Sequence, residues 1–318
     1  MPPFPKPSFT YNYQVDAQLT ALRTYRDSEP GRQIPAKQAD RLLLMTWNIA
    51  NLGAQERRPA DCRLIAEILS WADIAAVQEV NDDLSGLRAI QEHLPDHYRV
   101  LFSDAAGNNE RLAFVYDSRK VILGEEVGEV AVPPSQLRYI RLKDSEQRFE
   151  GFDRNPYIAL FSAGAFSFQL ASVHLYFGSE SAVSMNRRSL ETLAVARWAD
   201  HRRRSGRTVT QDIIALGDFN LPKAVAGDPI FDQLTARGLR LPPHSTAIGS
   251  SIASESHYDQ IAFFPGETQA QFTGSMGVFD MDGALFKTLR ESRSRADFLA
   301  YMRYYISDHR PLWAEFMT

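Results

Sequence analysis

Apolar runs alternate with amphipathic stretches along the chain from about residue 41 onward. Short runs rich in Val, Ile, Leu and Phe predict buried strands, whereas apolar residues spaced three and four positions apart predict helices. We expect strands at residues 42–49, 74–80, 98–102, 112–116, 127–132, 157–161, 166–175, 212–216, 259–264 and 311–316. Helices are expected at residues 63–71, 84–94 and 182–204.

The order of these elements predicts one α/β domain over residues 41–318. No repeat period appears in this region, and no linker rich in Gly, Ser or Pro divides it. Mostly antiparallel strands with helices grouped between them indicate two packed sheets flanked by helices. Residues 1–40 are rich in proline and carry only a weak helical pattern near residues 15–25, so we expect an N-terminal arm that packs on the domain.

Composition narrows the class of protein. A chain of 318 residues with 44% hydrophobic content can bury a large core. Lys and Arg number 35 against 39 Asp and Glu, so the chain has no overall positive charge of the kind that indicates a nucleic-acid partner. An enzyme that contacts DNA at one local site is still compatible with this charge. The single cysteine, Cys62, cannot form an intramolecular disulfide or a thiolate metal site, and its apolar neighbours predict a buried helix position.

The chain shows no signal for export or for a membrane span. It opens without a basic segment followed by an apolar one, and no apolar run approaches the roughly 18 residues that a spanning helix needs. We therefore expect a cytoplasmic enzyme or binding domain with no obligate protein partner.

Polar residues interrupt the apolar strands where the strands end. The segments concerned are Trp47-Asn48, Gln78-Glu79, Val173-His174, Asp218-Phe219-Asn220, Tyr258-Asp259 and Asp308-His309. Strand ends place side chains at the rim of a sheet, where a rigid scaffold supports a site. Carboxylate and amide oxygens suit a hard cation such as Mg²⁺ or Mn²⁺, and two distant histidines suit acid and base roles in a displacement at phosphorus.

Each of these segments taken alone also fits a structural role. Asp218-Phe219-Asn220 suits a turn, Asn48 and Glu79 suit backbone or surface contacts, and His174 suits a buried core histidine. A structural role is favoured for the remaining histidines and for the arginines that close the long helix, which are His93, His97, His201, His244, His257, Arg202, Arg203 and Arg204. The ordered occurrence of the strand-end residues across the whole domain favours a single active site.

The ordered set resembles the endonuclease/exonuclease/phosphatase superfamily, and within it the deoxyribonuclease I branch. The resemblance covers about residues 42–317. It rests on Trp47-Asn48-Ile49, Gln78-Glu79-Val80, Asn109-Glu110-Arg111, Arg154-Asn155-Pro156, Ser172-Val173-His174, Gly217-Asp218-Phe219-Asn220, Tyr258-Asp259-Gln260-Ile261 and Ser307-Asp308-His309-Arg310-Pro311. It implies a four-layered α-β-β-α sandwich of two mostly antiparallel sheets flanked by helices.

The resemblance also implies a role for each matched residue. It implies divalent-metal ligands at Asn48, Glu79, Asp308 and Asp218, with Asp218 and Asn220 also holding the phosphate and the attacking water. His309 would be the general base, oriented by Asp259, and His174 the leaving-group acid, held by Glu110. Arg154, Asn220 and Tyr258 would bind substrate. Two histidines, each fixed by a carboxylate, would hold the tautomers that base and acid chemistry require.

Two positions depart from the deoxyribonuclease pattern. Asn81 stands where that branch has a minor-groove arginine, and Asn108 stands where it has a tyrosine that stacks on a sugar. We therefore expect a Mg²⁺- or Mn²⁺-dependent phosphodiester hydrolase. A DNA endonuclease is the favoured activity, with weak affinity for duplex DNA. The alternatives are a phosphatase or phosphodiesterase acting on a nucleotide, sugar phosphate or phospholipid headgroup, and a non-catalytic binding domain. Both His–carboxylate pairs argue against a binding domain, which has no need of them.

Overall fold

The computed structural model describes residues 3–246 and 248–318 and contains two mixed β-sheets. The six-stranded sheet has the order β10-β11-β1-β2-β4-β3, and the five-stranded sheet has the order β5-β6-β7-β8-β9. Neighbouring strands run antiparallel except for the pairs β1–β2 and β7–β8. The strands are β1 (Arg41–Leu52), β2 (Ile74–Asn81), β3 (Tyr98–Phe102), β4 (Glu110–Asp117), β5 (Ile122–Glu129), β6 (Tyr157–Ala163), β7 (Phe166–His174), β8 (Ile213–Asp218), β9 (Asp259–Phe263), β10 (Phe272–Val278) and β11 (Leu312–Met317).

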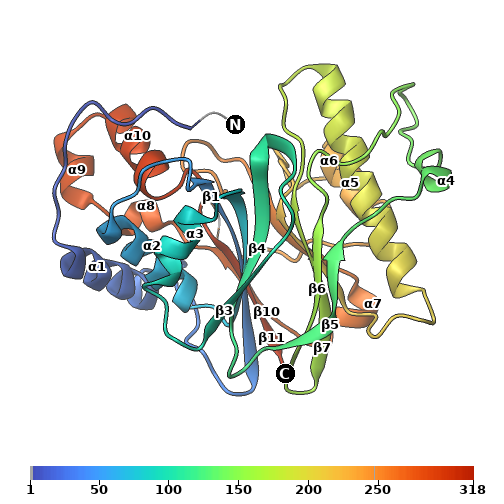
Figure 1. Ribbon diagram of the computed structural model, residues 1–318, viewed down its shortest axis with the longest axis horizontal. Coiled ribbons are helices and arrows are strands. Elements are labelled where there is room, and N and C mark those ends of the chain that lie inside the picture. The colour runs from blue at the N-terminus through green and yellow to red at the C-terminus, as the bar shows by residue number, and fades with distance from the viewer. Residues whose placement is uncertain (1–2, 247) are drawn as a thin grey trace.

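Helices cover the outer face of each sheet, so that the predicted four-layered sandwich is confirmed (Figure 1). One helical layer holds α1 (Val15–Ser28), α2 (Pro59–Ser70), α3 (Ser85–Gln91), α8 (Met281–Ala284), α9 (Lys287–Ser292) and α10 (Arg295–Tyr305). The opposite layer is built mainly from α5 (Ala182–Arg203) and α6 (Pro229–Thr235). Two single-turn helices, α4 (Pro134–Leu137) and α7 (Pro265–Thr268), lie in connections on that side.

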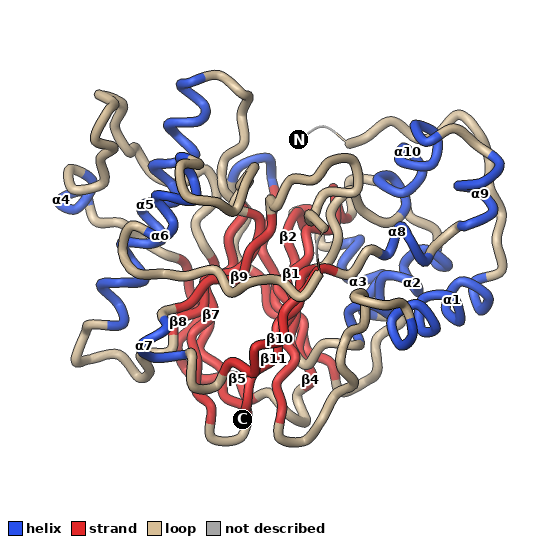
Figure 2. The backbone as a smooth tube through the Cα atoms, turned by 180° about the vertical axis from the view of Figure 1, so that it is seen from behind, coloured by secondary structure: helices blue, strands red, loops and turns tan. Residues whose placement is uncertain are grey.

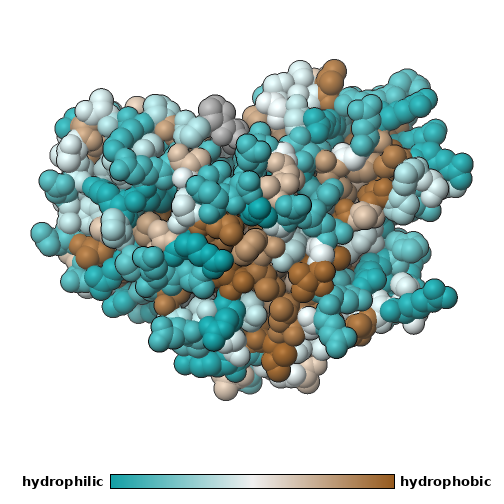
Figure 3. Space-filling view, viewed as in Figure 1, coloured by the Kyte–Doolittle hydropathy of each residue, from teal (hydrophilic) through white to brown (hydrophobic). Residues whose placement is uncertain are grey.

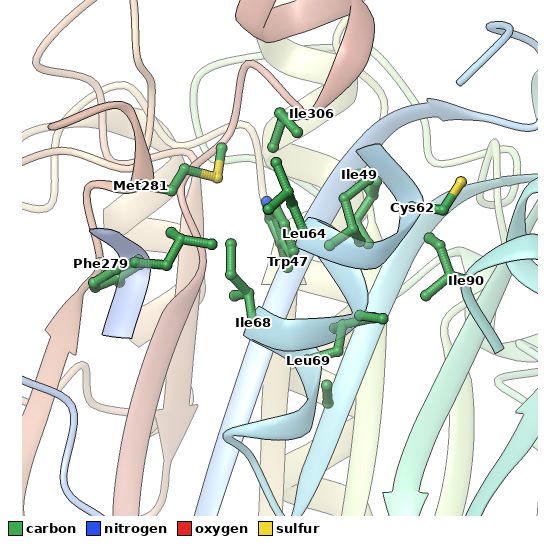
Figure 4. Packing of buried hydrophobic residues seen from close by; sticks show 14 of the residues in the cluster. Trp47, Ile49, Cys62, Leu64, Ile68, Leu69, Ile90, Phe279, Met281 and Ile306 are labelled. Carbon is green, nitrogen blue, oxygen red and sulfur yellow. The ribbon is translucent and has the colours of Figure 1, made fainter. Parts of the chain in front are cut away.

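Apolar side chains fill the space between the two sheets and the space under each helical layer. Phe114 of β4 meets Phe161 of β6 edge to face in the central layer, where both side chains are fully buried. On the outer side of β1, Trp47 packs against Leu64 and Ile68 of α2 (Figure 4). Cys62 lies on α2 and is buried, as the sequence predicted. Burial on both faces explains why β1 reads as a nearly continuous apolar run.

Several boundaries and the existence of several elements differ from the sequence prediction. Strand β1 continues to Leu52, beyond the end expected at residue 49, and α2 begins at Pro59 instead of residue 63. The strand expected at residues 127–132 is β5, Ile122–Glu129, because Pro133 and Pro134 follow and cannot extend a ladder. Its mixed pattern reflects an edge position with one face exposed.

Strand β10 was not predicted, since glycine and small polar residues give it no apolar period. Helices α4, α6, α7, α8 and α9 were missed because four to seven residues show too little periodicity. Helix α10 was also missed, although its apolar residues Phe298, Tyr301 and Tyr305 are spaced three and four positions apart.

Residues that precede β1 pack on the outer helical layer. Tyr13 donates a hydrogen bond to Asp61 of α2 (2.7 Å), and the same carboxylate group accepts from Arg58 (2.8 Å). The backbone N–H of Phe4 donates to Gln55 (2.9 Å), in the loop that follows β1. The first described residues therefore reach the end of the sandwich at which β1 finishes (Figure 1).

The two edge strands β3 and β5 lie on the same side of the sandwich. Figure 3 shows an apolar strip down the centre of this face, over these strands. Ile122 and Val127 of β5 are among the exposed apolar side chains of the described residues. Seen from behind, the opposite side presents β9 beside β1 and β10 (Figure 2). Within the described residues, no helix is both long enough and apolar enough to cross a membrane.

Candidate active site

Three adjacent strands of the five-stranded sheet place polar side chains in one row. His174 ends β7, Asp218 ends β8 and Asp259 begins β9. The β-ladders pair His174 with Asp218 and Asp218 with Asp259. Because direct cross-strand partners point to the same face, these three side chains meet at one end of the sandwich. The sheet register therefore assembles the centre of the site.

The other sheet contributes Asn48 of β1 and Glu79 of β2. The Nδ2 of Asn48 donates to Glu79 Oε1 (2.9 Å) and to Asp218 Oδ2 (3.1 Å), so one amide links the two sheets. Glu79 Oε2 also accepts from the backbone N–H of Asn51 (2.8 Å). The ladders of β2 shift register around Glu79, which adopts φ +60°. This bulge turns the carboxylate toward the neighbouring sheet.

Left-handed backbone conformations gather around these residues. Asn51, Glu79 and Asn220 have φ between 50° and 60°. Gly217 also has a positive φ, and a Cβ there would overlap the carbonyl oxygen of Val173. Non-glycine residues in this region cost of order 1 kcal/mol or more, and such strain persists mainly where surrounding contacts enforce it. Its concentration at one end of the sandwich is typical of a functional site.

His174 is held by a buried carboxylate and a buried guanidinium. Its Nδ1 lies 3.1 Å from Glu110 Oε2, and the same oxygen lies 3.4 Å from Nη1 of Arg154. Arg154 also donates from Nε to the carbonyl oxygen of His174 (2.9 Å). Burial opposes the charge on Glu110, but His174 and Arg154 outweigh it and lower its pKa to about 2. Arg154 therefore supports the His174–Glu110 pair, and its role in binding phosphate stays a prediction.

His309 is held by the second carboxylate pair. Its Nδ1 lies 2.7 Å from Asp259 Oδ2, and its Nε2 faces Asp218 Oδ2 at 3.9 Å. Burial disfavours the imidazolium, but Asp259 and Asp218 outweigh it and raise the pKa of His309 well above 6.5. The indole of Trp47 donates to the backbone carbonyl of His309 (2.8 Å) and fixes the loop.

The remaining predicted residues lie around this centre. The backbone N–H of Asn220 donates to Asp218 Oδ1 (2.8 Å), and its side chain donates to Leu175 O (2.7 Å). The ring of Tyr258 lies 5.8 Å from that of His309. Burial and the nearby charge of Glu79 raise the pKa of Asp308. The structure thus brings all the residues singled out from the sequence to one end of the sandwich, while their individual roles stay predictions.

The donor set fits a divalent cation. Asn48 Oδ1 is buried and has no hydrogen-bond partner among the described residues, although its Nδ2 has two. The charge of Glu79 repels that of Asp308 and contributes to the raised pKa of that carboxyl. A hard cation bound by Asn48, Glu79 and Asp308 would use the orphaned oxygen and offset that repulsion. Asp218, Asp259 and His309 also offer ligand atoms within 4.8 Å of one another.

The four-layered fold of this chain is shared with solved structures of endonuclease/exonuclease/phosphatase family proteins. A Bacteroides thetaiotaomicron protein of that family matches 88% of this chain and 98% of its own at 19% identity, with a TM-score of 0.56. D. rerio TDP2 in complex with a single-strand DNA product matches 87% and 99% at 14% identity, with a TM-score of 0.55.

A third similar structure is the 3′ phosphatase NExo from Neisseria bound to a product DNA hairpin. It covers 87% of this chain and 100% of its own at 16% identity, with a TM-score of 0.52. No protein-family model and no curated protein matches the sequence. The likeness is therefore one of fold.

Three residues to which the sequence assigned no role support the site. The Ser307 hydroxyl donates to Asn48 O (2.7 Å) and accepts from the N–H of His309 (3.0 Å), so it joins the two loops. Arg188 and Glu191 of α5 are fully buried beside the loops of the site. The sequence does hold a signal for them: both charged residues fall at the helical spacing of the apolar face of α5, which continues through Val195.

His309 should titrate above pH 6.5 in the metal-free protein. Its folded pKa is raised, so the stability it confers is complete below pH 6.5 and is lost as the pH rises through the higher value. Asp259→Asn removes the closest anion and should lower the pKa of His309. Ring proton shifts followed by NMR in excess chelator would measure both proteins. A wild-type midpoint at or below 6.5 would contradict the assigned electrostatics.

Proposed function

We propose that this chain hydrolyses phosphodiester bonds with a divalent cation, and that its substrate is DNA. One observation carries the proposal. The Nε2 atoms of His174 and His309 approach the same oxygen of Asp218, at 3.8 Å and 3.9 Å, and a separate carboxylate holds the far side of each ring. A purely structural core gains nothing from two such pairs around a third buried carboxylate.

The two histidines suit the two proton transfers of hydrolysis. His309, oriented by Asp259, would take a proton from the attacking water as the new P–O bond forms. His174, oriented by Glu110, would give a proton to the departing oxygen as the old P–O bond breaks. His309 therefore gains one proton and His174 loses one, and the products are a phosphate monoester and an alcohol.

The neighbouring groups supply charge and orientation. The backbone N–H of Asn220 bonds to Asp218, and its side-chain amide donates to Leu175 O; the groups of that amide not used in this bond would orient a phosphoryl oxygen or the water. A cation held by Asn48, Glu79 and Asp308 would offset the negative charge of the phosphate and of the buried carboxylates. That charge compensation would also lower the pKa of His309, so that a neutral ring is present to accept the proton.

DNA is supported as the substrate by the fold, since two similar structures hold DNA products. Phosphate ester hydrolysis on a smaller molecule is the second candidate, and it rests on the positions of two asparagines. Asn81 ends β2 beside Glu110, and Asn108 lies in the turn that precedes Glu110. Neither provides the cation or the aromatic ring expected of a duplex-binding deoxyribonuclease.

A panel of substrates tests the proposed function. Purified protein would be assayed on supercoiled plasmid, linear duplex, single-stranded oligonucleotide, a 3′-phosphorylated oligonucleotide and a nucleoside monophosphate, with Mg²⁺ and with excess chelator. Metal-dependent cleavage of internal bonds is the expected result. Release of inorganic phosphate with no internal cleavage would establish the phosphatase instead.

Asn81→Arg should increase duplex cleavage at moderate salt by about tenfold. Arginine adds one cation at the rim, and each added phosphate contact raises affinity and steepens its salt dependence. Rates at several NaCl concentrations would measure the gain, with Asn81→Gln as the uncharged control. Equal rates for both variants would indicate that duplex does not pass over this rim.

A further inference from the structure

Helix α5 places two buried charged side chains against the loops of the active site. Arg188 and Glu191 are fully buried, and a spacing of three residues puts them on one face of the helix. Burying a charge is costly unless hydrogen bonds compensate for it. The bonds that these two side chains make therefore indicate what they contribute.

Glu191 bridges two segments that are distant in sequence. Its Oε1 accepts from the backbone N–H of Asp153 (3.1 Å), and its Oε2 accepts from the backbone N–H of Tyr176 (3.0 Å). Asp153 directly precedes Arg154, and Tyr176 lies two residues after His174. One carboxylate thus fixes the spacing between the segment that carries the arginine and the strand end that carries the histidine.

The same two segments are joined again on the side of the active site. Arg154 donates to the carbonyl oxygens of His174 (2.9 Å) and Leu175 (3.4 Å), and it faces Glu110 (3.4 Å). Glu110 in turn contacts the ring of His174. The position of that ring therefore depends on Arg154, and the position of Arg154 depends on the bond from Asp153 to Glu191.

Arg188, which lies one turn before Glu191 on the helix, also fixes the loop that follows β8. Its guanidinium donates to the carbonyl oxygens of Asn220 (3.2 Å), Phe177 (2.8 Å) and Ser179 (3.3 Å). Its nearest carboxylate is the exposed Glu180, at 3.9 Å. Most of its hydrogen-bonding capacity is therefore spent on the backbone of the loops that follow β7 and β8.

We propose that Glu191, together with Arg188, is a positioning residue for the acid half of the site. The pair holds the loops so that the ring of His174 lies between Glu110 and the departing oxygen. Neither side chain touches the reacting atoms, because both are buried behind the loops. This inference rests on the proposed function, in which His174 protonates the leaving group.

Glu191→Gln tests the proposal, since glutamine keeps the size but sets an N–H against one of the two backbone donors. Misplacing a catalytic group by about 1 Å can cost up to about a hundredfold in rate. We expect kcat on a DNA oligonucleotide to fall about ten- to a hundredfold with little change in KM. On a nitrophenyl phosphodiester, whose leaving group needs no proton, the loss should stay below about threefold.

Asp200→Asn is the matched control. Asp200 is a buried carboxylate on the same helix, paired with Arg203 (2.9 Å) and Arg204 (2.9 Å) away from the site. Its replacement should leave the ratio of the two rates unchanged. The ring signals of His174 should shift at fixed pH in Glu191→Gln and stay in place in Asp200→Asn.

Two results would overturn the proposal: unchanged His174 ring signals in Glu191→Gln, or equal losses on both substrates. Failure of the wild-type protein to hydrolyse either substrate would count against the proposed function, and the ring signals would still decide whether Glu191 positions His174. Glu191→Ala should lose more than Glu191→Gln, because it removes both acceptors.

Discussion

Replacing Glu79 with glutamine should reduce hydrolysis at saturating Mg²⁺ by about a hundred- to a thousandfold. The charge of this carboxylate lies beside the orphaned Oδ1 of Asn48 and close to Asp308, where a cation fits. Metal-assisted stabilisation of phosphoryl charge is worth several kcal/mol, and each 1.36 kcal/mol is about tenfold in rate. Isothermal titration with Mg²⁺ or Mn²⁺ should show a matching loss of affinity.

The fold should survive this substitution. Glutamine keeps the size of Glu79 and removes its repulsion of Asp308, but it gives up one of the two hydrogen bonds that the carboxylate accepts, so the thermal unfolding midpoint without metal should stay near the wild-type value. Glu315→Gln is the matched control, because Glu315 is a buried carboxylate on β11 at the level of Leu43, toward the opposite end of β1. Full activity of Glu79→Gln at saturating metal would contradict the assignment.

Removing the two histidines should have different effects on substrates with different leaving groups. His309→Ala should lower the rates on DNA and on a nitrophenyl phosphodiester by about a hundred- to ten-thousandfold, because both reactions need the attacking water to lose a proton. His174→Ala should do the same on DNA but spare much of the nitrophenyl activity, since nitrophenolate departs as a stable anion. Glu110→Gln should follow His174→Ala in direction.

Rates on both substrates for these variants would separate the base from the acid. His93→Ala is the control, because His93 is an exposed histidine that follows α3. Equal losses on the two substrates for His174→Ala would show that His174 is not the acid. If His309→Ala spared the nitrophenyl activity instead, the two roles would be reversed.

Much of the fold was predictable because the strands are buried on both faces and show as continuous apolar runs. Strands β1 and β7 have this character, and both were located from sequence within a few residues. Edge strand β5 and the glycine-containing β10 lack it, since half of each faces solvent or carries small polar residues. The short helices α8 and α9 depend on packing in the same apolar cluster as β1 and α2 more than on their own periodicity.

The candidate site was predictable where a polar residue ends an apolar strand. His174 and Asp218 show this pattern, and the ladder that pairs them explains why it marks one place in the structure. Glu191 and Ser307 do not follow this pattern, because they support the site through hydrogen bonds to the backbone of loops that are distant in sequence. Sequence position alone does not reveal which loops meet.

The measurement that bears most directly on the central claim is the initial rate of DNA oligonucleotide cleavage by the wild-type protein and by Asp218→Asn, each with Mg²⁺ and with excess chelator. Asp218 lies between the two histidines and accepts a hydrogen bond from Asn48, so it contacts both proposed proton-transfer residues and a proposed metal ligand. We expect cleavage by the wild-type protein in Mg²⁺, its loss in chelator, its return when Mg²⁺ is restored, and no cleavage by Asp218→Asn under any condition. Wild-type rates that are equal with Mg²⁺ and with chelator, or an Asp218→Asn protein as active as the wild type, would contradict the account.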